Sequence, residues 1–142
     1  FAVKGRQSLL REENKEELHK YITGIVRNNN QKLLRINSVQ DHIHLLLGLK
    51  PDISLSDLVR DIKTNSSRFI NEKQWVKGKF HWQEGFGAFS YSQSHLDRVI
   101  QYIDQQQEHH RKKTFKEEYL ALLDNFQIKY DTRYVFEWLQ KE

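Results

Sequence analysis

The sequence predicts an α+β fold in which an antiparallel sheet carries helices on one face. The expected elements follow one another as strand, helix, strand, strand, helix and strand, with further helices behind them. This order is typical of the split βαβ, ferredoxin-like arrangement. Stretches with apolar residues at helical spacing lie between stretches in which apolar residues alternate, so predicted helices separate predicted strands as such a fold requires. The predicted fold is therefore ferredoxin-like with extra C-terminal helices.

Length and composition set the limits of this prediction. A chain of 142 residues is typical of one domain, so we expect residues 1–142 to form a single domain. Phe1 stands in what reads as the end of a strand, and we expect the first strand to be incomplete at its N-terminus. No apolar run approaches the ~20 residues that cross a bilayer. Zero cysteines exclude disulfides and thiolate metal sites. These features predict a cytoplasmic protein without a membrane partner.

Hydrophobic periodicity supports the first half of the arrangement. Residues 1–4 read as a strand end, and residues 12–29 carry apolar side chains at three- and four-residue spacing behind an acidic first turn. Residues 33–39 have moderate strand character. A short Gln-Asp connection, suited to an antiparallel hairpin, joins them to an apolar strand at 42–48.

Capping residues and glycines support the second half. Ser54 is expected to cap a helix that runs through Ile70, with an aspartate three residues after the serine. Residues 80–83 and 86–91 read as strand segments on either side of a Glu-Gly pair. Three later helices are expected to begin at Ser94, Thr114 and Asp131.

The strand at 42–48 holds the first candidate site. Alternation puts His42 and His44 on one face of the strand and its aliphatic residues on the other. Two imidazoles on a rigid strand can be metal ligands, but the same spacing also suits a polar pair without a metal. No second Cys/His pair at finger spacing accompanies them, which excludes a structural zinc site. A site with open positions suits Mg²⁺ or Mn²⁺ acting on phosphate oxygens.

The second candidate site is Tyr102 with Gln106. On the helix expected after Ser94 these residues are four apart and share one face. They flank the apolar stripe of that helix instead of forming it, so Tyr102 can present its hydroxyl at the helix edge. The alternative is an amphipathic tyrosine at the rim of the core, with its ring packed and its hydroxyl in water.

Basic residues form two groups along the chain. The net charge is +4, and the segment from Arg60 to Lys79 holds six basic residues against two acidic ones. Such patches are expected for a polyanion partner, although an ordinary solvated surface has the same composition. The candidate DNA-binding residues are Arg60, Lys63, Arg68, Lys73, Lys77 and Lys79, followed by Arg111, Lys112 and Lys113.

Together these segments resemble a known family. Residues 41–47 are similar to the His–hydrophobic–His motif of HUH endonucleases. Residues 80–90 resemble the Trp-Gln-x-Gly-aromatic segment of the single-tyrosine transposases of small, IS200-like insertion sequences, and Tyr102-x-x-x-Gln106 resembles their nucleophile helix. The resemblance covers Phe1 to Gln106 and continues more loosely beyond. Gln105 adjoins the glutamine of the motif, and Gln106 is preferred because it shares the face of Tyr102.

The resemblance implies a function and a set of partners. Tyr102 would attack a backbone phosphorus of single-stranded DNA, giving a 5′-phosphotyrosyl enzyme and a free 3′-OH. His42, His44 and Gln106 would hold a divalent ion, Mg²⁺ or Mn²⁺, and Asp41 or Gln83 would fix the histidine tautomers. Members of the family act as homodimers with shared active sites and recognise DNA hairpins at the ends of the element. The implied protein is a metal-dependent DNA transposase.

Other functions remain open at this point. A domesticated relative would act on chromosomal palindromic repeats, but such relatives tend to carry Asn-Pro after the tyrosine motif, where this chain has Gln105 and Gln106. A ferredoxin-like nucleic-acid-binding module without catalysis would keep the basic surface and would not need Tyr102 and Gln106 on one face. Replication initiators and relaxases of the HUH type are usually larger or circularly permuted.

Overall fold

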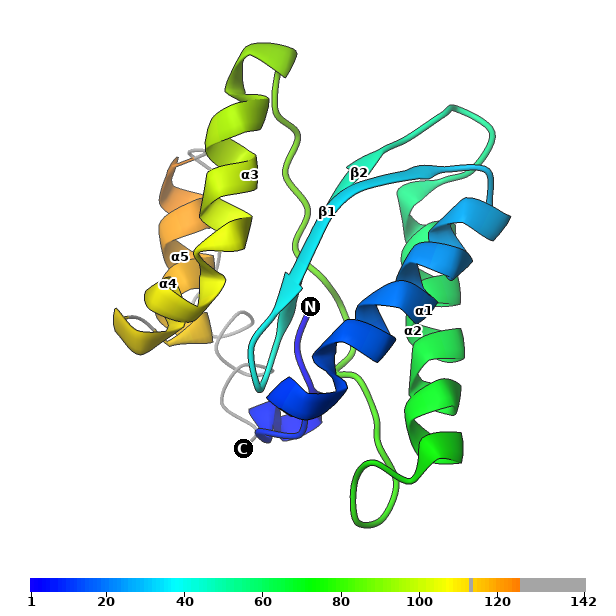
Figure 1. The fold of residues 1–142 in the computed structure, drawn as a ribbon. Coiled ribbons are helices and arrows are strands. Elements are labelled where there is room, and N and C mark those ends of the chain that lie inside the picture. The colour runs from blue at the N-terminus through cyan, green and yellow to red at the C-terminus, as the bar shows by residue number, and fades with distance from the viewer. Residues whose placement is uncertain (113, 126–142) are drawn as a thin grey trace.

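A computed structural model describes residues 1–112 and 114–125 as an α+β protein in which five α-helices surround a two-stranded antiparallel sheet (Figure 1). The helices and strands are α1 (Lys15–Asn28), β1 (Lys32–Ser38), β2 (Ile43–Gly48), α2 (Leu55–Lys73), α3 (Leu96–Asp104), α4 (Gln106–Lys112) and α5 (Phe115–Asn125). Short 3-10 turns occur at Lys4–Arg6, Glu12–Asn14 and Gln93–His95. The helix predicted from Asp131 lies outside the described residues.

The sheet is smaller than the predicted one. β1 and β2 form the expected hairpin, in which Asn37 pairs with His44. Beyond it, Ala2 forms an isolated bridge with His42 and Val3 forms one with Trp82. The N-terminal segment therefore lies between β2 and the segment around Trp82, in the place of a middle strand. These pairings are too short to extend the sheet, and the full ferredoxin-like pattern is not shown.

The strand predicted at 86–91 is wrong, and the one at 80–83 is reduced to the bridge of Trp82. Where these segments meet, the ammonium of Lys63 donates to the main-chain carbonyls of Gln83 and Gly85. Gly85 also has a φ of 84°, which interrupts an extended backbone. The segment consequently crosses the molecule as an irregular connection.

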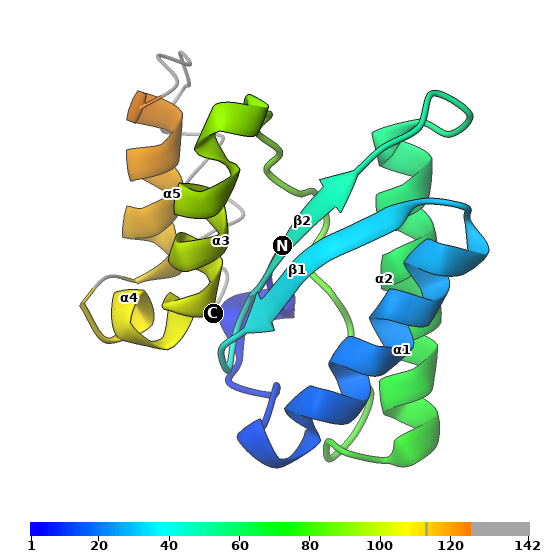
Figure 2. The same cartoon turned by 45° about the horizontal axis from the view of Figure 1, so that its top comes forward.

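The hydrophobic core lies between the sheet and the pair α1 and α2, which run side by side over one face of the hairpin (Figure 2). Ile43, Leu45 and Leu47 of β2 face this core, as the alternation predicted. The largest contributions come from Leu18, Ile22, Ile25, Val26, Leu58, Ile62, Ile70, Phe80 and Trp82. The opposite face of β2 is thus left for the histidines.

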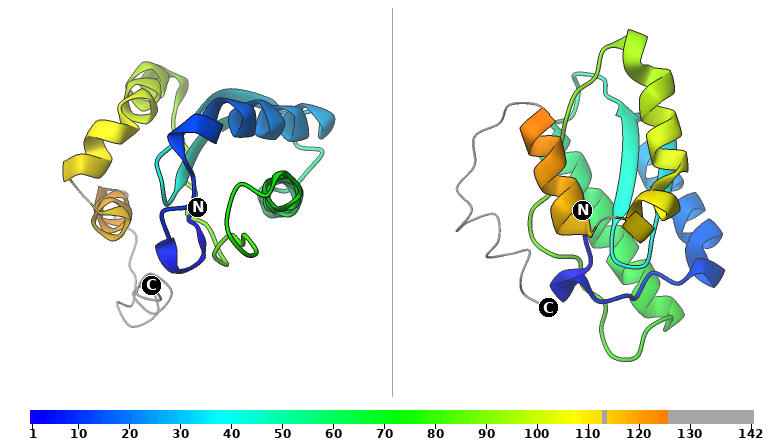
Figure 3. Two further views of the ribbon diagram at one scale, coloured as in Figure 1. Left: turned by 60° about the horizontal axis from the view of Figure 1, so that its bottom comes forward. Right: turned by 90° about the vertical axis from the view of Figure 1, so that its left-hand side faces the viewer.

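The helices α3, α4 and α5 lie together on the other side of the hairpin from α1 and α2 (Figure 3). Helices therefore cover both sides of the sheet, whereas the sequence predicted one side. Two of the predicted helix caps are confirmed. Ser54 caps α2 through Asp57 N at 3.1 Å, and Thr114 forms a capping box with Glu117. The cap predicted at Ser94 is wrong, since a 3-10 turn precedes α3 and its N-cap is His95.

The predicted single helix carrying Tyr102 and Gln106 is divided. α3 ends at Asp104, Gln105 leaves helical geometry with φ −96° and ψ 20°, and Gln106 begins α4. The break separates the two residues onto consecutive helices. Among the described residues, no helix is both long enough and apolar enough to cross a membrane.

Candidate metal and nucleophile site

The strand β2 and the residue before it present two histidines to α3 and α5. His42 is fully buried, and the His44 side chain is 19% exposed. Their rings meet edge to face at 5.3 Å between centroids. Asp41 Oδ1 accepts a hydrogen bond from Nδ1 of His42 at 2.7 Å, which leaves Nε2 of His42 directed into the site. Of the two partners proposed for fixing a tautomer, the structure therefore places Asp41 on His42.

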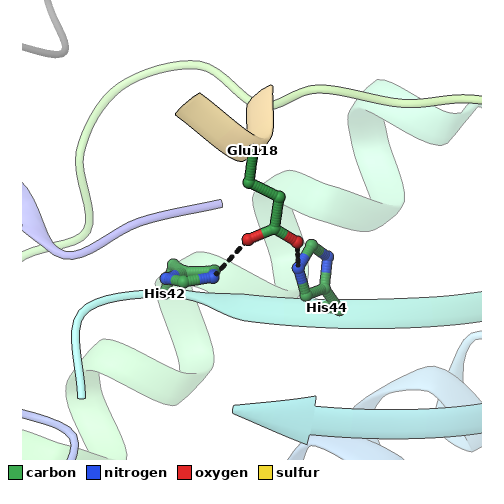
Figure 4. A group of neighbouring side chains, drawn as sticks. All are labelled: His42, His44 and Glu118. Carbon is green, nitrogen blue, oxygen red and sulfur yellow. Dashed lines mark hydrogen bonds and ion pairs between the residues drawn. The ribbon is translucent and has the colours of Figure 1, made fainter. Parts of the chain in front are cut away.

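A carboxylate from α5 lies across both imidazoles. Glu118 Oε1 is 2.7 Å from His44 Nε2, and its Oε2 is 3.3 Å from His42 Nε2 (Figure 4). The residue is 3% exposed. One ligand atom from each of the three residues lies within 4.8 Å of the others, which makes them a candidate metal-binding group.

The electrostatics of this group favour an ionised carboxylate. Burial by itself would raise the pKa of Glu118, but hydrogen bonds from His42, His44 and Tyr102 outweigh burial and hold that pKa well below its usual range. For His42, burial works to lower the pKa, and contacts with Asp41 and Glu118 reverse the direction and raise it. For His44, burial prevails and the pKa is lowered. A lowered pKa leaves the His44 imidazole neutral, which is the form that binds a metal.

These residues fit a divalent ion. Imidazole nitrogens and a carboxylate oxygen are common ligands of divalent metals, and a cation would compensate a charge that is costly to bury. Gln106 adds a further observation. It is 1% exposed, and among the described residues its Oε1 has no hydrogen-bond partner. Its Nε2 reaches only the main-chain oxygen of His42, at 3.5 Å. A buried amide oxygen of this kind is available as an additional oxygen donor.

Tyr102 joins the site from α3. Its hydroxyl donates a hydrogen bond to Glu118 Oε1, and its ring lies 5.8 Å from that of His44. Burial, together with the hydrogen bond to Glu118 and the charge of that residue, raises the pKa of Tyr102 far above its usual value. The phenol is therefore neutral here. The structure thus gathers all four residues predicted from sequence, His42, His44, Tyr102 and Gln106, beside β2.

Two residues of the site were missed by sequence reasoning. Glu118 is 74 positions from His44 along the chain, and no local spacing connects them. A signal did exist, because Glu118 follows Phe115 by three residues and so puts an acid on the apolar face of the predicted helix. Asn37 is the second: its Nδ2 donates to the main-chain oxygen of Ile103 at 2.7 Å and holds the end of α3 against β1.

The predicted DNA-binding residues differ in whether they bind other groups of the same chain. Four have intramolecular partners, since Lys63 binds main-chain carbonyls and three others form ion pairs. The ion pairs join Arg60 to Asp57 at 3.2 Å, Lys73 to Glu17 at 3.0 Å and Arg111 to Glu108 at 2.9 Å. Arg68, Lys77 and Lys79 are exposed and have no ion pair within the described part of the chain. The side chain of Lys112 and all of Lys113 lie outside the description.

Residues 1–106 match the family described as "Transposase IS200 like". The chain is 26% identical over 113 residues to the ISDra2 transposase TnpA of Deinococcus radiodurans, a match that covers 75% of this chain and 79% of the relative. It also resembles the crystal structure of a provisionally assigned transposase from Deinococcus radiodurans R1, with a TM-score of 0.59 and 26% identity over 75% of this chain and 85% of the other.

Proposed function

We propose that this chain, which belongs to the IS200-like transposase family, cleaves and rejoins single-stranded DNA at insertion-sequence ends through a 5′-phosphotyrosine on Tyr102. Membership of the family makes the protein an enzyme of DNA transposition. One observation carries the finer proposal. The hydroxyl of Tyr102 lies in the same buried cluster as His42, His44 and Glu118, in hydrogen-bond contact with the carboxylate. A tyrosine at the rim of the core would not need such a contact.

The reaction consists of two phosphoryl transfers. In the first, the Tyr102 oxygen forms a bond to phosphorus, the bond from phosphorus to the 3′ oxygen breaks, and the phenol proton leaves as the 3′ oxygen gains one. In the second, a 3′-OH attacks the phosphotyrosine and releases the phenol. The covalent intermediate conserves the phosphodiester energy, so the strands can be rejoined without ATP.

The residues of the chain hold the reacting groups. Glu118 keeps the hydroxyl of Tyr102 at the site, and Asp41 orients His42. His42 and His44, with Glu118 and Gln106 as oxygen donors, would hold Mg²⁺ or Mn²⁺. Such an ion, when bound, polarises the scissile phosphate and stabilises the charge that develops on the leaving oxygen.

The proposed substrate is single-stranded DNA with hairpin ends, and the proposed assembly is a homodimer in the cytoplasm. Arg68, Lys77 and Lys79 support a DNA contact because their exposed charges are available to phosphates. In the described arrangement Tyr102 reaches Glu118 of its own chain. An exchange of α3 between subunits would bring the same groups together from two chains.

A covalent-trapping experiment tests this function. The protein is incubated with single-stranded hairpin DNA carrying element-end sequence and Mn²⁺, and adducts are sought on a denaturing gel. We expect an adduct with the wild type, none with Tyr102→Phe, and unchanged hairpin binding by that variant. Tyr21→Phe is a matched control, because Tyr21 is exposed on α1 and stacks on Phe69, on the other side of the sheet. An adduct that persists in Tyr102→Phe would contradict the proposal.

A further inference from the structure

The carboxylate of Glu118 connects the two parts of the site. It is within 3.3 Å of Nε2 of His42, within 2.7 Å of Nε2 of His44, and it accepts the hydroxyl hydrogen of Tyr102. The residue lies on α5, twelve positions beyond the segment that matches the family, which ends at residue 106. Its role is therefore not implied by that match and has to be argued from this structure.

The burial of a charge at this position needs an explanation. A carboxylate that is 3% exposed is costly to bury unless it is paired and hydrogen-bonded. Apolar contacts that do not involve Glu118 also hold α5, because Phe115 and Tyr119 pack with Ala2 in a separate apolar cluster. The carboxylate is thus explained by what it faces, which is two imidazole nitrogens and a phenol.

We propose that Glu118 is the third protein ligand of the divalent ion held by His42 and His44, and that the same carboxylate positions the hydroxyl of Tyr102 beside that ion. The second part of this inference rests on the proposed function. Gln106, which the family resemblance implied as the third ligand, is then a further oxygen donor. It is a neutral donor, and its amide nitrogen reaches the main-chain oxygen of His42 at 3.5 Å.

Charge supports Glu118 over Gln106 as the main oxygen ligand. Mg²⁺ and Mn²⁺ are hard cations that favour carboxylate oxygens, and a negative ligand contributes more to their affinity than a neutral amide does. The ion and Glu118 would also stabilise each other. The ion offsets the buried charge of Glu118, while the hydrogen bond from Tyr102 fixes the orientation of the carboxylate as an outer-shell partner does.

The position of α5 gives an independent way to move Glu118. Gly87 of the irregular connection lies directly against the ring of Tyr119, and a Cβ at residue 87 would be 2.5 Å from Cε2 of that ring. A side chain at this position must displace the ring of Tyr119, the residue next to Glu118 on α5. Gly87→Val therefore perturbs the surroundings of Glu118 without altering any proposed ligand.

The first test is a Mn²⁺ titration without DNA, followed by the electron paramagnetic resonance of free Mn²⁺. We expect Glu118→Gln to weaken binding by about 10- to 100-fold, the range seen even for outer-shell partners, and Gly87→Val to weaken it as well. Glu117→Gln is the matched control, because it removes the same charge from the same helix. Glu117 is exposed and bonded to Thr114, away from the histidines. Gln106→Ala should weaken binding less than Glu118→Gln does, because a neutral amide contributes less than a carboxylate.

A second measurement reports on Tyr102 directly. In protein labelled with 3-fluorotyrosine, the ¹⁹F resonance of residue 102, assigned by its loss in Tyr102→Phe, should shift in Glu118→Gln and stay in place in Glu117→Gln. Wild-type Mn²⁺ affinity in Glu118→Gln, with a large loss in Gln106→Ala, would overturn the inference and make Gln106 the third ligand.

The inference and the proposed function fail in different ways. If Mn²⁺ binding depends on Glu118 but no Tyr102-dependent adduct forms, Glu118 remains a metal ligand and the proposed function is refuted. If a Tyr102-dependent adduct forms but Glu118→Gln binds Mn²⁺ normally, the proposed function stands and the assignment of Glu118 as a ligand is refuted.

Discussion

A continuous row of partly buried polar contacts runs from Asp41 through His42 and Glu118 to the hydroxyl of Tyr102. Each contact fixes the next group. Asp41 determines which nitrogen of His42 faces the site, and Glu118 determines where the phenol lies. His42 and Glu118, in the middle of the row, are buried and have no water to replace a lost partner, so a single substitution there affects the groups on both sides.

The first prediction concerns Asp41. Asp41→Asn removes the charge that holds Nδ1–H of His42 and leaves its tautomer unspecified. We expect Mn²⁺ affinity to fall by about 10- to 100-fold, because outer-shell partners of metal-binding histidines have effects of that size. Isothermal titration calorimetry would measure the change. Asp61→Asn on α2 is the control, and equal affinities for the two variants would refute the role of Asp41.

The second prediction concerns His19, which lies away from the site. Burial, and secondarily the charge of Lys15, lower its pKa from 6.5 to about 4, and its Nε2 contacts Ser38 Oγ at 2.9 Å. The unfolded chain therefore binds the proton more readily than the folded one. The contribution of neutral His19 to stability is complete above pH 6.5 and is lost as the pH falls from 6.5 towards 4.

Urea unfolding measured across this pH window tests the direction of that effect. Other groups titrate in the same range, so the comparison is between the wild type and His19→Gln. We expect the wild type to lose more unfolding free energy on acidification than the variant does. Identical losses in the two proteins would show that His19 is not held in its neutral form.

The helix α3 is held to the sheet at the end that carries Tyr102. Asn37 is buried on β1, directly opposite His44 in the ladder, and its Nδ2 donates to the main-chain oxygen of Ile103 at 2.7 Å and to Gln107 Oε1 at 3.3 Å. The last carbonyls of a helix lack partners within the helix, so this amide satisfies one of them. It also fixes the position of α3 relative to the strand that carries His44.

The third prediction follows from this attachment. Asn37→Ala should lower the rate of adduct formation by at least about tenfold, because Tyr102 loses its fixed distance from the histidines, while Mn²⁺ affinity changes by less than about threefold. The loss of a buried hydrogen bond costs about 1–3 kcal/mol of folding stability, which a thermal melt would reveal.

Arg35→Ala is the control for Asn37. Arg35 contacts the same end of α3 through an ion pair with Asp104 at 3.4 Å, but both side chains are about half exposed, so the pair contributes little. We expect nearly wild-type rates for this variant. If Asn37→Ala and Arg35→Ala behaved alike, the amide would have no special role in positioning Tyr102.

Across the complete fold, the site forms where two groups of helices meet the sheet from opposite sides. The pair α1 and α2 buries the aliphatic face of β2, and the helices α3 to α5 cover the histidine face. The residues brought together come from β2, α3, α4 and α5, so the site depends on the tertiary arrangement as much as on any local motif.

This dependence explains which features the sequence predicted. The faces of His42 and Ile43 were predictable because strand alternation has a fixed period. The capping roles of Ser54 and Thr114 were predictable because a cap needs only residues within one turn. Glu118 was missed because its partners are far away in the chain.

The errors have local causes as well. The strand predicted at 86–91 is preceded by Gly85 with a positive φ and by bonds from Lys63 to the main-chain carbonyls of Gln83 and Gly85, and alternation alone does not reveal such features. The break at Gln105 was also missed. Nothing in residues 96–112 interrupts a helix by propensity, and the break occurs where the Asn37 amide contacts the end of α3.

The central claim is that Tyr102 attacks DNA phosphorus and keeps the 5′-phosphate. Hairpin DNA labelled at its 3′ end and hairpin DNA labelled at its 5′ end, each incubated with the wild-type protein and Mn²⁺, test it directly, with mass spectrometry of the digested adduct. We predict that only the 3′ label stays on the protein and that the modified peptide carries the nucleotide on Tyr102. Retention of the 5′ label, or modification of another residue, would contradict the account.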